Sequence, residues 1–149
     1  MTLAPPVRRL ALLSLASFAL VVLFGTIRAA PTPLKAFLAA SPDAERAMAS
    51  FHAHFDALCW LGAAALAVAL HLLGAARAPA WAAPACGSGY LAGSLAFSGG
   101  YAVKAFGLAA GLPLVAKGLA TALISGGGLL LVGAAAAAAL LAWSARRGD

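Results

Sequence analysis

The sequence predicts an all-α integral membrane protein, a four-helix transmembrane bundle forming one domain over residues 1–149. Two features of the composition predict this. Of the 149 residues 64% are hydrophobic and 9% are charged, against about half and about a quarter in an average soluble domain. A soluble fold of this length buries only about 60–70% of its unfolded surface, so it could not hide this much apolar surface. The third observation is a series of four apolar stretches of about 20 residues, each long enough to cross a bilayer.

The first stretch covers residues 10–27 and follows the basic pair Arg8-Arg9. A basic pair before an apolar run is also typical of a secretory signal, which is the alternative interpretation. The apolar run is longer than a usual signal core. We therefore expect it to be retained as a transmembrane helix.

The second stretch is predicted to form a helix over residues 42–73. Ser41 can cap its start, Pro42 suits the first helical position, and Asp43 and Glu45 place negative charge in the first turn. The remaining two helices are predicted over residues 85–108 and 119–143. Prolines and glycines mark the connections between the helices.

Net charge of +6 would suggest nucleic acid in a soluble protein, but here the basic residues are scattered over loops and helix ends. They indicate topology and contacts with anionic lipid instead, so no nucleic-acid partner is predicted. An even number of crossings places both termini on one side. The arginine pairs at 8–9 and 146–147, with Arg77, predict a cytoplasmic side for both termini in the inner (plasma) membrane. Five further basic residues fall on the opposite side: Arg28, Lys35, Arg46, Lys104 and Lys117.

Two smaller features concern packing. Small residues recur along the third helix at spacings of three, four or seven, which predicts close approach of another helix and suits a dimer face. They are Gly89, Gly93, Ala96, Gly100 and Gly107. Cys59 and Cys86 lie in apolar stretches without a CxxC spacing, so we expect buried, reduced thiols.

Ionisable residues inside a membrane helix are costly and mark candidate functional sites. The second helix opens with His52, His54 and Asp56. At 100° per residue, His52 and Asp56 share a face with Cys59 and Ala63, which we expect to be the interior of the bundle. His54 points to the opposite, leucine-rich face, which we expect to face lipid, a bulky apolar ligand or another subunit.

The third helix carries a matching stripe at spacings of three and four: Tyr90, Ser94, Phe97, Tyr101 and Lys104. The second and third helices are antiparallel. The C-terminal end of the third helix, with Tyr101 and Lys104, should therefore lie at the same membrane level as His52, His54, Asp56 and Arg28. Purely structural roles are also open to these residues. Asp56 and Lys104 could form a compensating ion pair, Arg28 and Lys104 could snorkel to the head groups, and the histidines could be interfacial hydrogen-bonding groups.

A neutral imidazole is the commonest protein ligand of haem iron, and one histidine is enough for a pentacoordinate b-type haem. His52 and His54 cannot bind one metal ion together from a regular helix, so their spacing does not predict a zinc site. They predict two roles, both candidates for cofactor binding. No serine is placed for a hydrolytic nucleophile.

The helix start at Ser41–Glu45, followed by Ala53-His54 and then Gly62, resembles styrene oxide isomerase, a family of small four-helix membrane enzymes. The resemblance implies haem b with His54 as axial iron ligand, Tyr101 as a polar group of the pocket, and isomerisation of an epoxide to an aldehyde. The family's asparagine after the histidine has no counterpart here. The His52-Ala53-His54 opening is also similar to NnrS-type membrane proteins, which contain haem and copper.

The resulting hypothesis is a haem-b-binding membrane protein, forming homo-oligomers, that acts as a Lewis-acid epoxide isomerase on a small apolar substrate. In that hypothesis Tyr101 or Asp56 steers the opened cation. One alternative is a non-catalytic subunit of a larger respiratory or transport complex in the membrane. The other is a small proton-coupled transporter in which Asp56 and His52 relay protons.

Overall fold

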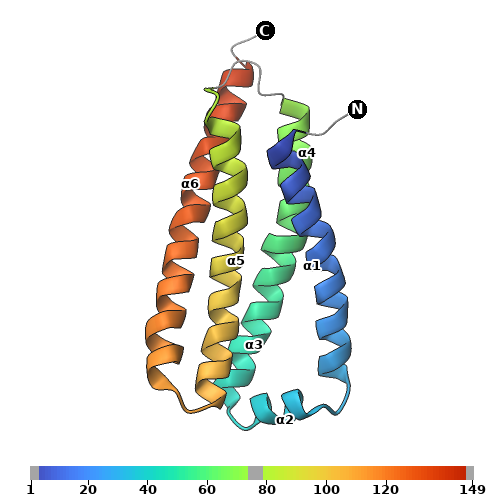
Figure 1. Ribbon diagram of the computed structural model, residues 1–149, viewed down its shortest axis with the longest axis vertical. Coiled ribbons are helices and arrows are strands. Elements are labelled where there is room, and N and C mark those ends of the chain that lie inside the picture. Colours follow the sequence, from blue (N-terminus) through green and yellow to red (C-terminus); the bar gives the residue numbers. More distant parts are fainter. Residues whose placement is uncertain (1–3, 74–78, 147–149) are drawn as a thin grey trace.

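The computed structural model describes residues 4–73 and 79–146, and these residues form helices and no strand. Four long helical segments run antiparallel, and one short helix crosses the end opposite the termini (Figure 1). The predicted all-α class is confirmed. Within the described part of the chain, three helical segments are long and apolar enough to cross a membrane, and they cover Pro5–Ile27, Pro42–Leu72 and Leu114–Ala145.

Helix α1 (Pro5–Ala29) begins five residues before the predicted start, because a proline at the first position suits a helix and the N–H of Arg8 already donates to the Ala4 carbonyl at 3.0 Å. Helix α2 (Pro33–Ala39) falls in a segment expected to be a loop. The side-chain oxygen of Thr32 caps it by accepting from the N–H of Lys35 at 3.2 Å.

The second predicted helix is confirmed over residues 42–73, and it is built in three parts. Helix α3 (Pro42–His54) starts at Ser41, whose hydroxyl accepts from the N–H of Ala44 at 3.3 Å as predicted. A π-helix, η1 (Phe55–Gly62), follows, and α4 (Ala63–Leu73) continues it. The wide turns of a π-helix, with hydrogen bonds from i to i+5, change which residues share a face.

Helix α5 (Ala82–Ala109) ends in a turn at Gly111, which has a φ of +68°. The N–H groups of Gly111 and Leu112 donate back to the carbonyls of Leu108 and Gly107 at 3.2 and 2.8 Å. This is a Schellman motif, which favours glycine at the residue with positive φ. The chain then enters a second π-helix, η2 (Leu114–Leu119), and α6 (Ala120–Arg146).

Helices α5 and α6 pack with their backbones in near contact. A Cβ atom on Gly93 would lie 2.9 Å from the Gly127 carbonyl oxygen, and one on Gly127 would lie 2.4 Å from the backbone nitrogen of Phe97. A Cβ on Gly100 or Gly107 would also press on backbone atoms, at 3.0 Å and 2.8 Å. The small-residue prediction of close helix packing is therefore confirmed, and the partner of α5 is α6.

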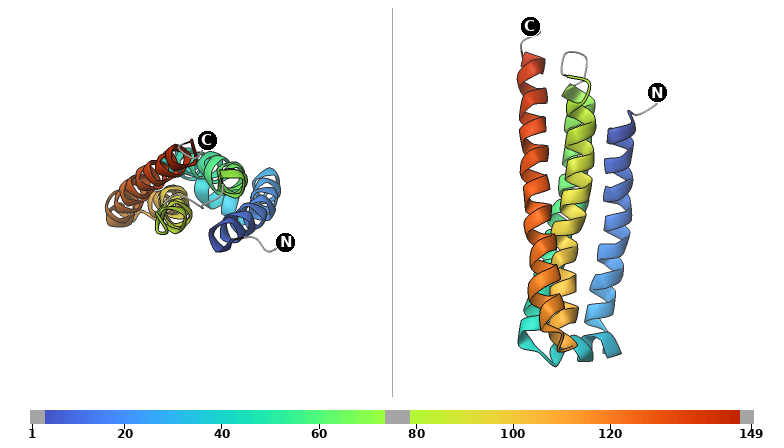
Figure 2. Two further views of the ribbon diagram at one scale, coloured as in Figure 1. Left: turned by 90° about the horizontal axis from the view of Figure 1, so that it is seen from above. Right: turned by 60° about the vertical axis from the view of Figure 1, so that its left-hand side comes forward.

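The four long segments do not close into a ring. Seen from above, α1 and α6 lie on opposite sides of the molecule, with α5 and the α3–η1–α4 segment between them (Figure 2). One apolar cluster joins α2, α3 and α5 around Met48 and Phe51, and another joins α1 to α4 around Leu10 and Ala63. The α3–η1–α4 segment thus connects the α5–α6 pair to α1.

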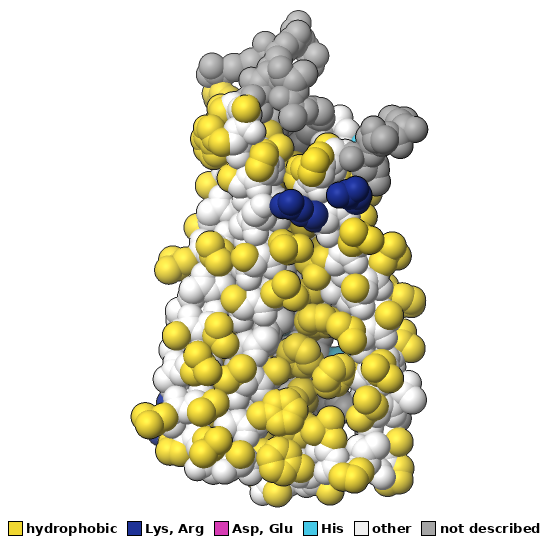
Figure 3. Space-filling model, viewed as in Figure 1, with side chains coloured by type: hydrophobic (Ala, Val, Ile, Leu, Met, Phe, Trp, Pro, Cys, Tyr) yellow, Lys and Arg dark blue, Asp and Glu magenta, His cyan; other side chains and the backbone are white. Residues whose placement is uncertain are grey.

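Large apolar side chains cover much of the outer surface, as the face in Figure 3 shows. Leu15 of α1, Leu72 of α4, and Leu129 and Val132 of α6 are each more than half exposed. Exposing such a surface to water is unfavourable, whereas the hydrocarbon of a bilayer solvates it. The outer surface therefore suits a lipid bilayer.

Candidate functional site

His54 is the last residue of α3 and lies where the helix widens into η1. Its Nδ1 lies 2.7 Å from the carbonyl oxygen of Ser50, one turn earlier. A carbonyl can only accept, so Nδ1 carries the hydrogen and donates it. In the neutral ring, Nε2 then carries the free lone pair, and the ring geometry directs it away from Ser50.

Two aromatic side chains of α5 pack against the His54 ring. The ring stacks on Tyr101 with 4.8 Å between centroids and 5° between planes, and it meets Phe97 edge-on at 5.1 Å. Phe97 and Tyr101 also contact each other at 5.7 Å. We name His54, Phe97 and Tyr101 the aromatic triad. It fixes the orientation of an imidazole that stays partly exposed.

The predicted face of His54 is wrong, since its ring packs against α5 instead of pointing away from the other helices. Cys59 and Ala63 are fully buried as expected, but the side chains of His52 and Asp56 remain 32% and 30% exposed. The reason is η1. Its wider turns rotate Cys59 and Ala63 away from the direction of Asp56, so these residues no longer form the single face of a regular helix.

His52 and Asp56 form a separate pair on α3 and η1. Their Nε2 and Oδ2 atoms lie 3.6 Å apart, and the other carboxylate oxygen of Asp56 is buried without a hydrogen-bond partner. The sequence left open an ion pair between Asp56 and Lys104. It is not among the ion pairs of the described residues. Since Tyr101 is level with His54, Lys104 lies a turn away in the opposite direction from Asp56.

Lys104 instead lines a cavity of about 440 Å³ together with two other basic side chains, Arg46 of α3 and Lys117 of η2. We name this cavity the basic pocket. Ser50 and Tyr101 also line it, so it adjoins the aromatic triad. The predicted convergence at one level therefore divides into three groups: the aromatic triad, the His52–Asp56 pair and the basic pocket. The side chain of Arg28 and all of Arg77 lie outside the described residues.

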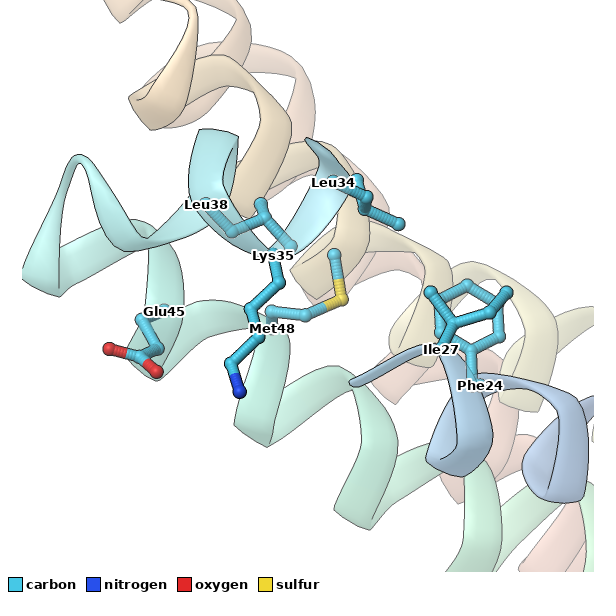
Figure 4. A pocket seen from close by; sticks show the side chains of 7 residues that line it. All are labelled: Phe24, Ile27, Leu34, Lys35, Leu38, Glu45 and Met48. Carbon is cyan, nitrogen blue, oxygen red and sulfur yellow. The ribbon is translucent and has the colours of Figure 1, made fainter. Parts of the chain in front are cut away.

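A different cavity, of about 320 Å³, opens between α1, α2 and α3 (Figure 4). Apolar side chains make up most of its wall, and Lys35 and Glu45 add a charge of each sign. Its apolar lining residues are Phe24, Ile27, Leu34, Leu38 and Met48. Sequence reasoning missed this cavity because three of its seven lining residues lie on α2, which was expected to be a loop.

Buried and partly buried polar contacts link η1 to α5. The hydroxyl of Tyr90 donates to the Leu58 carbonyl at 2.9 Å, and the Cys59 sulfur lies 4.0 Å from the Ser98 hydroxyl. Both cysteines are buried and free, as predicted. Within residues 4–73 and 79–146, no group of three or more histidine, cysteine, aspartate or glutamate side chains could hold a metal ion.

Comparison of the chain with protein-family models, with curated proteins and with solved structures finds no match. The resemblance to styrene oxide isomerase therefore stays a prediction. Its two site residues, His54 and Tyr101, are in contact although 47 positions separate them in the sequence.

Proposed function

We propose that this chain is a multi-pass membrane protein with four crossings that binds b-type haem through His54. The fourth crossing is α5, whose 28 residues extend about 42 Å and exceed the roughly 30 Å hydrocarbon core. Its glycines and serines lower its hydropathy, and several of them are buried against α6 and η1. In this position α5 needs less apolar surface than the helices that face lipid.

The observation that supports the haem proposal best is the hydrogen bond from Nδ1 of His54, which sets the tautomer of the ring. A ligating histidine commonly donates its other ring N–H to a carbonyl, which fixes the tautomer and increases the basicity of the ligating nitrogen. The bond from Nδ1 to Ser50 fixes the tautomer in this way and leaves Nε2 for iron. Haem needs only one such protein ligand, so the lack of a multi-residue metal cluster among the described residues does not conflict with it.

His54 would hold the iron through Nε2, and its ring is partly exposed, so lipid or a second copy of the chain would cover the rest of the bound group. Ferric haem supplies a Lewis acid that can polarise an epoxide oxygen. Tyr101 stacks on the ring of His54 and would therefore hold the ligand in place, on the side of the haem opposite a bound epoxide. Asp56 is paired with His52, so the isomerase proposal would depend on the iron without the steering role predicted for Tyr101 or Asp56.

The proton-transport alternative has its own supporting observation in the His52–Asp56 pair. A carboxylate oxygen buried without a partner beside an imidazole is suited to exchanging a proton. Proton-dependent flux into liposomes that is lost in Asp56→Asn, in a preparation that never takes up haem, would favour transport over haem binding.

The test is an absorption spectrum of the purified protein after reconstitution with haemin, before and after dithionite. Wild type should show a Soret band, and His54→Ala should lose it while its helix content is unchanged. His71→Ala is the matched control, because His71 lies near the other end of the same helical segment. His52→Ala should also keep the band.

Two results would overturn the proposal. One is a wild-type protein that takes up no haem at stoichiometric haemin. The other is retention of the Soret band by His54→Ala with loss in His52→Ala, which would move the ligand to the His52–Asp56 pair.

A further inference from the structure

The basic pocket draws its charge from three separate helical segments. Arg46 lies near the start of α3, Lys104 near the end of α5, and Lys117 within η2. One carboxylate, that of Asp43, also lines the pocket, so the formal charge of its lining residues is +2. No described feature of the proposed haem site uses this charge.

The two lysines have their charge uncompensated. Asp43 is ion-paired with Arg46, three residues along the same helix. Across the described part of the chain, the other ion pair is His52–Asp56, so no described carboxylate lies within ion-pairing distance of Lys104 or Lys117. Like charges are brought together here without an internal counter-ion, and an external anion would relieve their repulsion.

The position of the pocket indicates the source of that anion. Lys104 precedes the end of α5 by five residues, or about 8 Å along the helix, and Lys117 follows the turn into η2. With the apolar helices in a bilayer, both ammonium groups lie at head-group depth. Leu119 follows Lys117 toward the middle of the membrane and is 53% exposed, which provides an apolar surface for an acyl chain.

We propose that the basic pocket binds the phosphate of an anionic phospholipid, with the acyl chains extending toward the middle of the bilayer past Leu119. Lys104 and Lys117 supply the main attraction, and Ser50 and Tyr101 also line the pocket. Basic pockets between transmembrane helices recognise anionic head groups in this way. This inference depends on the membrane placement proposed above and not on haem.

The experiment is native mass spectrometry of the haem-free full chain in detergent, titrated with phosphatidylglycerol or with phosphatidylcholine. Wild type should bind phosphatidylglycerol selectively. The double variant Lys104→Gln/Lys117→Gln should weaken that binding about thirtyfold, since each interfacial cation contributes about 1 kcal/mol. Asp43→Asn should strengthen it, because it removes the carboxylate and frees Arg46.

Lys104→Gln alone should weaken the binding about fivefold. Lys35→Gln is its matched control, as it also removes one positive charge, from α2 at the same end of the molecule but outside the basic pocket. It should change the affinity less than threefold. An equal loss in the control would show general electrostatic attraction and overturn the pocket. Competition by glycerol phosphate at the same affinity as the lipid would assign the site to a soluble anion, and equal binding of phosphatidylcholine would remove the charge argument.

A failure of this inference is distinguishable from a failure of the proposed function. The lipid titration uses haem-free protein, so a missing Soret band does not affect it. Extraction of the chain from membranes by alkaline carbonate would instead disprove the membrane placement that both proposals share.

Discussion

Gly62 ends the π-helix at a point where a side chain of α5 takes the space that a Cβ would need. A Cβ on Gly62 would lie 2.0 Å from the Tyr90 hydroxyl oxygen and 2.9 Å from the Ala57 carbonyl oxygen. The same hydroxyl donates to the Leu58 carbonyl. The absence of a side chain at Gly62 therefore leaves the space that the Tyr90 hydroxyl needs to donate to Leu58.

Gly62→Ala should destabilise the protein by about 1–3 kcal/mol because the methyl group overpacks this contact. Tyr90→Phe should cost about 1 kcal/mol from the lost hydrogen bond. Their combination should cost less than the sum of the two, since phenylalanine removes the closest clashing atom. Unfolding titrations in mixed micelles give the three free energies, and simple additivity would contradict the contact.

At this scale, sequence spacing predicted that His54 and Tyr101 lie at one level, and the structure places their rings in contact. Spacing could not predict the direction of His54, because that depends on a π-helix whose wide turns leave no clear mark in the residue pattern. It also missed the basic pocket. Arg46 and Lys117 were counted only for topology, although their places near helix starts at one end could have joined them to Lys104.

The α5–α6 interface is the element with the closest backbone approach. Gly127 of α6 faces the Phe97 backbone, whereas Gly126, one residue earlier, has no heavy atom within 4 Å of the position that a Cβ would take. Two adjacent glycines in one helix therefore differ only in the face they occupy. They form a matched pair for testing the interface.

Gly127→Ala should destabilise the protein by about 1–3 kcal/mol, because its methyl group would press on backbone that cannot rotate away. Gly126→Ala should be neutral or stabilising, since alanine favours a helix by about 1 kcal/mol over glycine. Unfolding titrations of both variants in the same micelles make the comparison. Equal effects would place the helices further apart than described.

At the scale of elements, apolar length predicted the four long helices, and the Ser41 cap predicted the start of α3. The predicted ends were a few residues short for α5 and α6 because polar and small residues at helix ends lower the apolar signal. Helix α2 was missed for a similar reason. Its seven residues are too few for a periodic pattern, although Thr32-Pro33 is a typical helix start.

At the scale of the whole molecule, the positions of the helix ends bear on how many segments cross the membrane. Helix α1 begins and α6 ends at the same end of the molecule, while α2 and the turn at Gly111 lie at the other (Figure 1). Within the described residues, hydropathy alone selects three spanning helices and omits α5. The fourth crossing is our proposal, which the antiparallel course of α5 beside α3 and α6 supports.

Three and four crossings give opposite results for the termini, so topology reporters decide between them. Fusions at Met1, Arg77 and Asp149 should report one side, which the arginine pairs predict to be the cytoplasm, and an insertion at Lys35 should report the other. Glycosylation or phosphatase tags provide the signal, and protease protection in sealed vesicles checks it independently. Opposite signals from Met1 and Asp149 would mean an odd number of crossings, which would exclude α5 as the fourth. Agreement of both termini with Lys35 would mean that α1 does not cross.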